Sequence, residues 1–284
     1  DTALSGADPK LLGCWSVCGN SAEQEFQKFT DKQDESTLEA GFMWQKISRK
    51  SQKYGLQAEV TSFVTISGDM EVEYVEITNI SDKDVEVVPI GVIPVYGRSA
   101  DNLRDHRHVT SLLHRIQTTE YGVEVKPVLS FDERGHQKNN TTYFVYGSAE
   151  NGEKPESFYP TVEAFIGEGG TFLNPEAVRT NKPGKTAGTK IQGKEAVGGL
   201  RFSRKTLKPK EAAGYILLSG TTKTSDSIAL LTSGCRTKLQ VQKMLEEVKE
   251  HWIQKVNVAF ETGNSDVDNY LKWICFQPIL RRIY

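Results

Sequence analysis

Short segments of alternating apolar and polar residues fill the chain from about residue 44 to residue 231, which is the pattern of half-buried β-strands. Ala58–Ile66 alternates in this way, and Ser67-Gly68-Asp69 predicts a turn from it into a second strand, Met70–Thr78. Ser81–Asp84 predicts the next turn, into Val85–Ile93. Further strands are expected at Val123–Leu129, Thr142–Gly147, Val162–Ile166, Gly199–Leu207 and Gly214–Ser219. Short strands at short spacing predict a mainly β fold, a large antiparallel β-sandwich.

The spacing of apolar residues changes near Thr237, from every second residue to every third or fourth. This is the stripe of an amphipathic helix, with charged residues on the opposite face. The stripe consists of Val241, Met244, Leu245, Val248, Trp252 and Val256. We therefore predict a helical linker over residues 237–262, after a β-sandwich domain that covers residues 1–236.

Residues 263–284 open another helix and give no signal that ends it. Ser265 and Asp268 have the spacing of a capping box at a helix start, and Pro278 is expected to kink or interrupt the helix. Its apolar face consists of Val267, Leu271, Ile274, Ile279 and Ile283. No glycine, asparagine or polar tail follows Arg282. We expect this face to pack on further structure, and the chain to be the front part of a larger protein.

Composition and charge narrow the class of protein. The formal net charge is −2, with 37% hydrophobic and 25% charged residues, as in ordinary soluble proteins. A nearly neutral balance argues against nucleic acid or an anionic membrane as the main partner, and no apolar run is long enough to span a bilayer. Cys14, Cys18, Cys235 and Cys275 form no disulfide framework at this length. We interpret them as buried thiols in a reducing cytosol and expect a cytoplasmic protein.

The richest group of polar side chains lies in one short block, residues 94–114. Arginine forks, imidazoles and a tyrosine are groups that hydrogen-bond sugar hydroxyls or phosphate in a partly dry cleft. The candidates for facing a ligand or an interface are Tyr96, Arg98, Arg104, His106 and His108. The alternative is a polar loop that ion pairs of Asp105 pin to the sandwich. The two histidines could form a metal pair, but no third ligand is spaced to complete it, so no metal is predicted.

Other features of the sequence do not indicate a catalytic or phosphate-binding site. Gly167-Glu168-Gly169-Gly170 lacks the Gly-Lys-Ser/Thr of a phosphate-binding loop and predicts only a turn. No Gly-x-Ser-x-Gly elbow of a serine hydrolase is present in the sequence. Glu71 and Glu73 lie on a strand face and are interpreted as solvated charges. The aromatic residues of the predicted strands are interpreted as core: Tyr143, Phe144, Tyr146, Phe158 and Tyr159.

Several stretches, taken in chain order, carry a family resemblance. They are Cys14-Trp15-Ser16, Glu73–Asp82 followed by Val85–Ile93, Glu163–Pro175, Leu245–Asn257, and a run that contains Trp273, Gln277 and Arg282. Together they cover nearly the whole chain. They resemble the front of the glycoside hydrolase family 94 phosphorylases, most closely the 1,2-β-oligoglucan phosphorylases, and the block of residues 94–114 resembles that branch in particular.

The resemblance implies a fold and a reaction. The fold is a β-supersandwich related to galactose mutarotase, then a helical linker, then the first helix of an absent (α/α)6 barrel that begins within residues 263–284. The reaction is reversible phosphorolysis with inversion, in which an aspartic acid protonates the leaving oxygen while inorganic phosphate, the co-substrate, attacks the anomeric carbon. The family's general acid lies in a segment beyond Tyr284, so no catalytic residue is assigned in this chain, and no other cofactor is implied.

On this resemblance, the chain serves as scaffold, interface and partial cleft wall of a bacterial enzyme that converts β-1,2-linked gluco-oligosaccharides to glucose 1-phosphate. Its expected partners are its own catalytic barrel, a β-glucan oligosaccharide and a second copy in a homodimer. Two alternatives stay open: a free-standing carbohydrate-binding or mutarotase-like domain, and the phosphorylase region of a cyclic β-1,2-glucan synthase. A mutarotase needs a histidine and a glutamate as acid and base, for which the chain offers His108, His114, Glu120 and Glu163.

Overall fold

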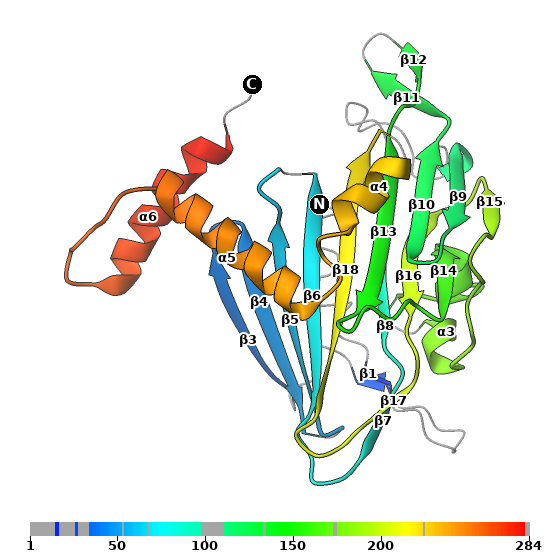
Figure 1. Cartoon of the computed structure of the whole chain (residues 1–284), viewed down its shortest axis with the longest axis horizontal. Helices are drawn as coiled ribbons and strands as arrows, with labels where there is room; N and C mark the ends of the chain where they lie inside the picture. The colour runs from blue at the N-terminus through cyan, green and yellow to red at the C-terminus, as the bar shows by residue number, and fades with distance from the viewer. Residues whose placement is uncertain are drawn as a thin grey trace.

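The computed structural model of the chain describes residues 15–16, 26–27, 34–52, 54–67, 69–97, 111–132, 135–172, 175–223 and 225–281. Figure 1 shows a mainly β molecule, as predicted, and its helices lie on the outside. The strands are β1 (Trp15–Ser16), β2 (Phe26–Gln27), β3 (Asp34–Gly41), β4 (Trp44–Ser51), β5 (Leu56–Val64), β6 (Met70–Asn79), β7 (Val85–Val87), β8 (Ile90–Val95), β9 (His114–Thr118), β10 (Gly122–Pro127), β11 (Leu129–Asp132), β12 (Gly135–Lys138), β13 (Thr142–Ala149), β14 (Ser157–Thr161), β15 (Lys190–Gln192), β16 (Ala196–Arg201), β17 (Lys205–Leu207) and β18 (Ala212–Thr222). The helices are α2 (Val162–Ile166), α3 (Glu176–Arg179), α4 (Ser225–Thr232), α5 (Lys238–Lys255) and α6 (Ser265–Leu280).

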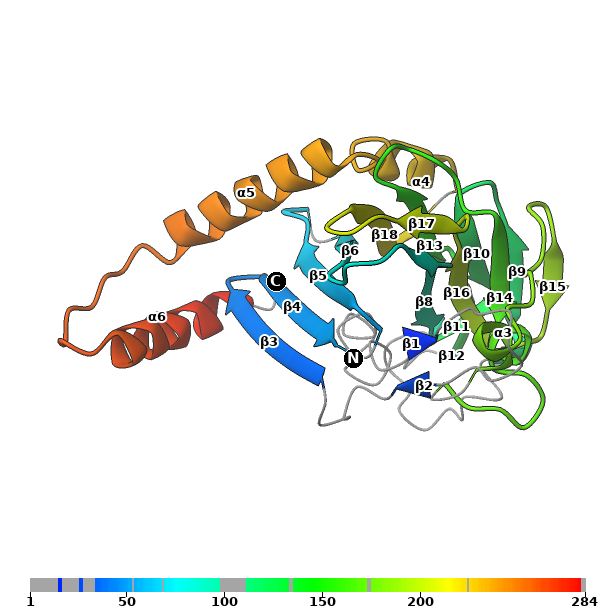
Figure 2. The same ribbon diagram turned by 90° about the horizontal axis from the view of Figure 1, so that it is seen from below.

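One large antiparallel sheet of nine strands forms the frame of the molecule, in the order β15-β9-β10-β13-β18-β6-β5-β4-β3. Figure 2 shows that this sheet is curved. Such curvature is expected, because each strand twists and the twist accumulates across a large sheet. The chain turns between β5 and β6, where the turn between Ala58–Ile66 and Met70–Thr78 was predicted, and the backbone N–H of Thr65 donates to the carbonyl oxygen of Met70 at 3.0 Å. The long central strands β5, β6 and β18 lie side by side, with β6 in the middle.

A second antiparallel sheet, in the order β14-β16-β8, stacks inside the curve against β10 and β13. Buried apolar side chains fill the space between the sheets, among them Val125, Val145 and Leu200. Gly198 of β16 permits the close approach, because a Cβ atom added there would lie 2.2 Å from Cβ of Val145. The resulting two-layer core makes the fold an antiparallel supersandwich.

Helix α5 packs on the outer face of the large sheet, against β5 and β6. Thr237 caps its start in a capping box with Gln240. Val241 and Val248 are buried in one apolar cluster with Val72 of β6. The amphipathic stripe predicted for this helix is confirmed, since its apolar residues face the sheet.

The start of α6 differs from the prediction by one residue. Asn264, not Ser265, caps the helix, and its side chain accepts from the backbone N–H groups of the second and third helical residues. Asp268 instead accepts hydrogen bonds from the backbone N–H of Thr262 at 2.9 Å and from its hydroxyl at 2.7 Å. Pro278 lies inside α6 without interrupting it, since the helix continues to Leu280. Arg282, Ile283 and Tyr284 lie outside the described residues.

The buried face of α6 is aromatic. Phe276 is 1% exposed and packs against Phe42 of the β3–β4 turn, with ring centroids 4.6 Å apart. The rings of Trp252 and Trp273 lie 5.3 Å and 5.2 Å from the same side chain. The predicted apolar residues Val267 and Ile274 are exposed, so part of the predicted face points to solvent.

The strand predicted at Val162–Ile166 is wrong, because these residues form helix α2. The hydroxyl of Thr161 accepts from the backbone N–H of Ala164 at 3.1 Å and starts the helix. Gly167 ends it with φ 82, a conformation that favours glycine. Val162 and Phe165 are its buried residues, three apart as on a helix face. A five-residue apolar run has too few turns to show its period in the sequence.

Candidate ligand-binding cavity

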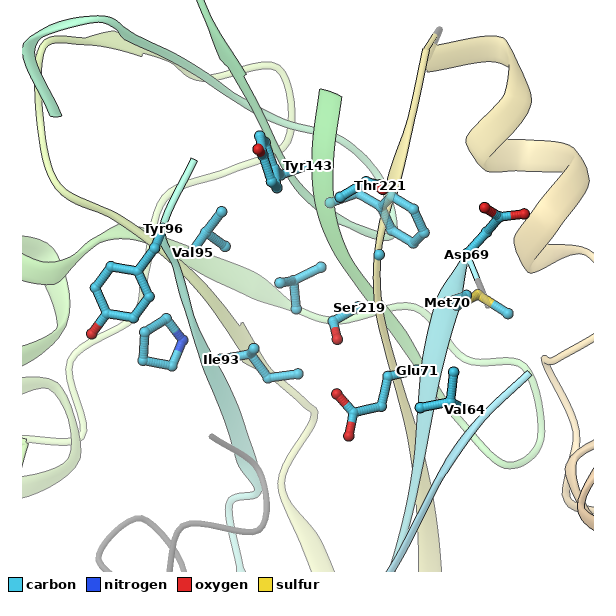
Figure 3. Close-up of a pocket in the computed structure, with 14 residues that line it drawn as sticks. Val64, Asp69, Met70, Glu71, Ile93, Val95, Tyr96, Tyr143, Ser219 and Thr221 are labelled. Carbon is cyan, nitrogen blue, oxygen red and sulfur yellow. The ribbon is translucent and has the colours of Figure 1, made fainter. Parts of the chain in front are cut away.

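A cavity of about 280 Å³ lies inside the curve of the large sheet, where β6, β18 and β13 face β8 (Figure 3). Apolar side chains form much of its wall, and a carboxyl group and hydroxyl groups lie on the side of β6 and β18. Its lining consists of Val64, Asp69, Met70, Glu71, Ile93, Pro94, Val95, Tyr96, Tyr143, Phe144, Val145, Ser219, Gly220 and Thr221. Apolar walls with a few polar groups are typical of small-molecule sites.

Glu71 and Glu73 share the inner face of β6, because strand residues two apart point the same way. Across the β5–β6 pairing, Ser62 stands opposite Glu73, and across the β6–β18 pairing, Ser219 stands opposite Glu71. The Ser62 hydroxyl is buried and has no hydrogen-bond partner among the described residues. Two carboxyl groups and two hydroxyl groups therefore lie on neighbouring strands of one inward-facing surface.

Burial changes the acidity of both glutamates. Loss of water raises the pKa of Glu71 to about 7, although a hydrogen bond with Ser219 acts in the opposite direction. Burial, with the nearby charge of Glu71, raises the pKa of Glu73 to about 8, and this residue is only 2% exposed. The interpretation of the two glutamates as solvated charges is wrong, because the curvature of the sheet turns their face inward.

Two tyrosines line the cavity. Tyr143 comes from β13, and Tyr96 directly follows β8. Figure 3 shows the Tyr96 ring directed away from Glu71, whereas the side chain of Ile93 extends toward the open space. Tyr96 is 41% exposed, so it lies at the outer edge of the cavity. Tyrosine combines a large apolar ring with a polar tip, which suits a ligand with both kinds of surface.

Of the candidate residues predicted from the sequence, Tyr96 lines the cavity. Arg98, Arg104, His106 and His108 lie outside the described residues, as do Cys14 and Cys18. Their predicted roles therefore stay predictions. Within the described part of the chain, no group of three histidine, cysteine, aspartate or glutamate side chains could hold a metal ion. Cys235 is buried, as interpreted from the sequence, whereas Cys275 is only half-buried.

The remaining acid–base candidates do not converge on the cavity. His114 is buried, and its ring nitrogens contact the carbonyl oxygens of Lys194 at 3.2 Å and Gly97 at 3.3 Å. Burial lowers the pKa of this imidazole. Glu163 and Glu120 form exposed ion pairs with lysines, and neither lines the cavity. These contacts give the three residues structural roles and do not support a mutarotase-like acid and base.

The sequence of β6 contains a signal that Glu71 and Glu73 are buried. Its inner face reads Glu71, Glu73, Val75 and Ile77, so carboxyl groups and apolar residues share one face. The opposite face carries Met70, Val72 and Tyr74, which are buried. A strand that is apolar on both faces is covered on both faces. Glutamates within such a strand are therefore expected to be buried.

The structure defines the chain as an antiparallel β-supersandwich with a helical extension. Residues 15–249 match the family model "Glycosyl hydrolase 94, supersandwich domain", so the chain belongs to this family. Comparison with curated proteins gives no match. No described helix is both long and apolar enough to cross a membrane.

Solved structures that resemble the chain come from several carbohydrate-related proteins. One is assigned as a kojibiose phosphorylase from the human microbiome, with TM-score 0.45 and 10% identity, covering 83% of this chain and 26% of its own. Another is a bacterial glucoamylase complexed with acarbose, with TM-score 0.45 and 8% identity, covering 78% of this chain and 29% of its own. A galactose mutarotase-like protein from Clostridium acetobutylicum has TM-score 0.33 and 8% identity, covering 74% of this chain and 72% of its own. The chain thus spans less than a third of the first two proteins.

Proposed function

We propose that the chain is the supersandwich and linker of an inverting glycoside phosphorylase. The enzyme would use inorganic phosphate to convert β-1,2-linked gluco-oligosaccharides to glucose 1-phosphate. The observation that carries this proposal is the family match over residues 15–249. The resemblance of residues 94–114 to the oligoglucan branch supports the choice of β-1,2 linkage. In this proposal the chemistry belongs to a catalytic barrel of which this chain contains only the first helix, and no cofactor besides phosphate is needed.

The proposed role of this chain is to hold that barrel in place and to form part of its cleft wall. Helix α6 is fixed to the sandwich by Phe276, while another side of it leaves Val267, Tyr270 and Ile274 exposed. These three residues lie three and four apart, so they form one apolar face. Covering such a face releases roughly 25 cal/mol for each Å² of apolar surface removed from water. We propose that the barrel covers it.

Replacing Tyr270 with aspartate tests this role in the longer protein that contains the barrel. Tyr270 is 63% exposed in the chain, so the substitution should leave the stability of the supersandwich unchanged. A buried, unpaired carboxylate at the barrel contact should lower phosphorolysis at least about tenfold, since an unpaired buried charge costs several kcal/mol. Thermal unfolding and initial rates of glucose 1-phosphate release are the measurements.

The matched control is Leu230→Asp, which changes another exposed apolar residue, on α4, far from α6 in Figure 1. This variant is expected to keep the full rate. Equal rates for both variants and the unchanged protein would show that α6 does not contact the barrel through this face.

A further inference from the structure

Four polar side chains lie next to one another on the inner face of the large sheet, and we refer to them as the acidic cluster. They are Ser62 of β5, Glu71 and Glu73 of β6, and Ser219 of β18. Ser62 stands directly opposite Glu73, and Ser219 stands directly opposite Glu71. Residues opposed in this way have Cβ atoms about 4.5–5.5 Å apart. Figure 3 shows the Glu71 carboxyl group directed into the open space of the cavity.

Two members of the acidic cluster are buried without the partners that burial demands. Ser62 is 3% exposed, and its hydroxyl has no hydrogen-bond partner among the described residues. Glu73 is 2% exposed, and both burial and the nearby charge of Glu71 oppose its ionisation. Such groups lower the stability of the free chain, and a buried unpartnered hydroxyl is uncommon in folded proteins. A ligand that donates hydrogen bonds to this surface supplies the missing partners.

The chemistry of the acidic cluster favours a primary ammonium group. An ionised carboxylate only accepts hydrogen bonds, and a hydroxyl oxygen accepts them too, whereas an ammonium group offers three N–H donors and a positive charge. A calcium ion fits less well, because it takes six to eight oxygen ligands. In the part of the chain that the structure describes, no group of three histidine, cysteine, aspartate or glutamate side chains could hold a metal ion.

The cavity beside the acidic cluster has room for the organic part of such a ligand. Its volume of about 280 Å³ lies at the lower end of the range for small-molecule pockets, about 300–1,000 Å³. Glu71 and Ser219 belong both to the cluster and to the cavity lining, so the two are continuous. Ile93 extends its apolar side chain toward the open space from the opposite strand, β8 (Figure 3). One end of the ligand thus meets carboxyl groups and the other meets apolar side chains.

We infer that the acidic cluster binds the primary ammonium group of a small organic amine, whose apolar part lies in the cavity against Ile93. Ionised Glu71 pairs with the ammonium group. Glu73 keeps its proton, since two close carboxyl groups disfavour a second negative charge, and its carbonyl oxygen accepts an N–H hydrogen bond, as does the hydroxyl of Ser62. The residues that carry this site belong to β5, β6 and β18, and the site is independent of the proposed phosphorolysis.

Binding of the amine is expected to strengthen about tenfold between pH 6 and pH 8. Burial raises the pKa of Glu71 to about 7, so its carboxyl group loses its proton within this interval, whereas an alkylammonium group stays charged, with a pKa of about 10.4. The other titratable side chains in the described lining are Asp69, Tyr96 and Tyr143. Asp69 and Tyr96 are directed away from Glu71 in Figure 3, and burial raises the pKa of Tyr143, which therefore stays neutral.

Calorimetric titration of the 284-residue chain with cyclohexylamine and with cyclohexanol, at pH 6 and pH 8, tests this site. The two probes share a ring and differ in the ammonium group, so the amine should bind saturably at pH 8 and the alcohol at least about tenfold more weakly. Glu71→Gln should lower the affinity for the amine at least about tenfold and remove its dependence on pH. Ser62→Ala should lower it about threefold to tenfold. Glu39→Gln, which changes an exposed carboxylate on the edge strand β3, is the matched control and should change nothing.

Thermal unfolding of the ligand-free variants separates binding from folding. Ser62→Ala removes a buried hydroxyl that has no partner among the described residues, so the variant should be at least as stable as the unchanged chain while it binds the amine more weakly. Four results would overturn the inference: no saturable binding of cyclohexylamine at pH 8, equal affinities for the amine and the alcohol, amine binding that neither variant weakens, or displacement of the amine by Ca²⁺ or Mg²⁺, which would assign the acidic cluster to a metal ion.

Discussion

Replacing Glu73 with glutamine is expected to raise the free energy of unfolding of this chain at pH 8 by on the order of 2–4 kcal/mol. Glu73 is 2% exposed on the inner face of β6, and burial raises its pKa to about 8. In the unfolded chain the same carboxyl group has its ordinary pKa of 4.5. Glutamine keeps the shape and hydrogen-bonding capacity of the protonated acid and removes the cost of ionising it in a dry place.

The sign of the effect follows from proton binding. Between pH 4.5 and about 8 the folded state keeps the proton of Glu73, whereas the unfolded state has lost it. The folded state therefore binds more protons, and the free energy of unfolding falls as the pH rises through this range. Glu71, with its pKa near 7, adds to the same slope. Near pH 5 the glutamine variant and the unchanged chain should have nearly equal stability.

Urea unfolding at pH 5 and pH 8 measures this prediction. Glu39→Gln is the control, because Glu39 lies exposed on the edge strand β3 and its replacement should leave the free energy of unfolding unchanged at both pH values. A Glu73→Gln variant that is less stable than the unchanged chain at pH 8 would mean that Glu73 is ionised and stabilised there, against the structure described above.

The second large effect is expected for Phe276→Ala, which should destabilise the attachment of α6 by about 3–5 kcal/mol. Phe276 is 1% exposed and is surrounded by the rings of Phe42, Trp252 and Trp273. Loss of its ring leaves a cavity between α5, α6 and the β3–β4 turn, and aromatic contacts add about 0.5–1.5 kcal/mol to the area term. Because this cluster lies at the end of the chain, α6 should detach while the supersandwich remains folded.

Hydrogen exchange of the α6 backbone amides measures the detachment. Protection of α6 should fall to that of a free peptide in Phe276→Ala, whereas β6 and β18 should keep theirs. Tyr270→Ala is the matched control, since Tyr270 is an aromatic residue of the same helix that is 63% exposed. Unchanged protection of α6 in Phe276→Ala would show that contacts other than this aromatic cluster hold the helix.

Individual helices and strands were predictable where the regular spacing of apolar residues repeats several times along the sequence. Residues Val241 and Val248 belong to a stripe of several turns, and α5 was predicted with its correct face. Val162–Ile166 shows the opposite case: it is too short to display a period, and the cap by Thr161 decided its conformation. At α6 two neighbouring residues could both cap a helix, and the conformation of the loop before it selected Asn264.

The cavity was less predictable, because it depends on how distant strands stack. Glu71 and Ser219 are neighbours through strand pairing, although they are far apart in the sequence. Tyr96 was selected for its position in a polar block, and the structure places it in the cavity beside groups that the sequence analysis did not connect with it. The burial of Glu73 follows from the curvature of the nine-stranded sheet and from the second sheet inside it. These are properties of the assembled layers and not of one strand.

The most direct test of the proposed function is an assay of the longer protein that contains this chain and its barrel. Incubation with β-1,2-linked gluco-oligosaccharides and inorganic phosphate is expected to release glucose 1-phosphate as the α-anomer, since direct attack by phosphate inverts the β-linkage. The 284-residue chain alone is expected to release none. Release of free glucose without a phosphate requirement, or phosphorolysis by this chain alone, would contradict the account.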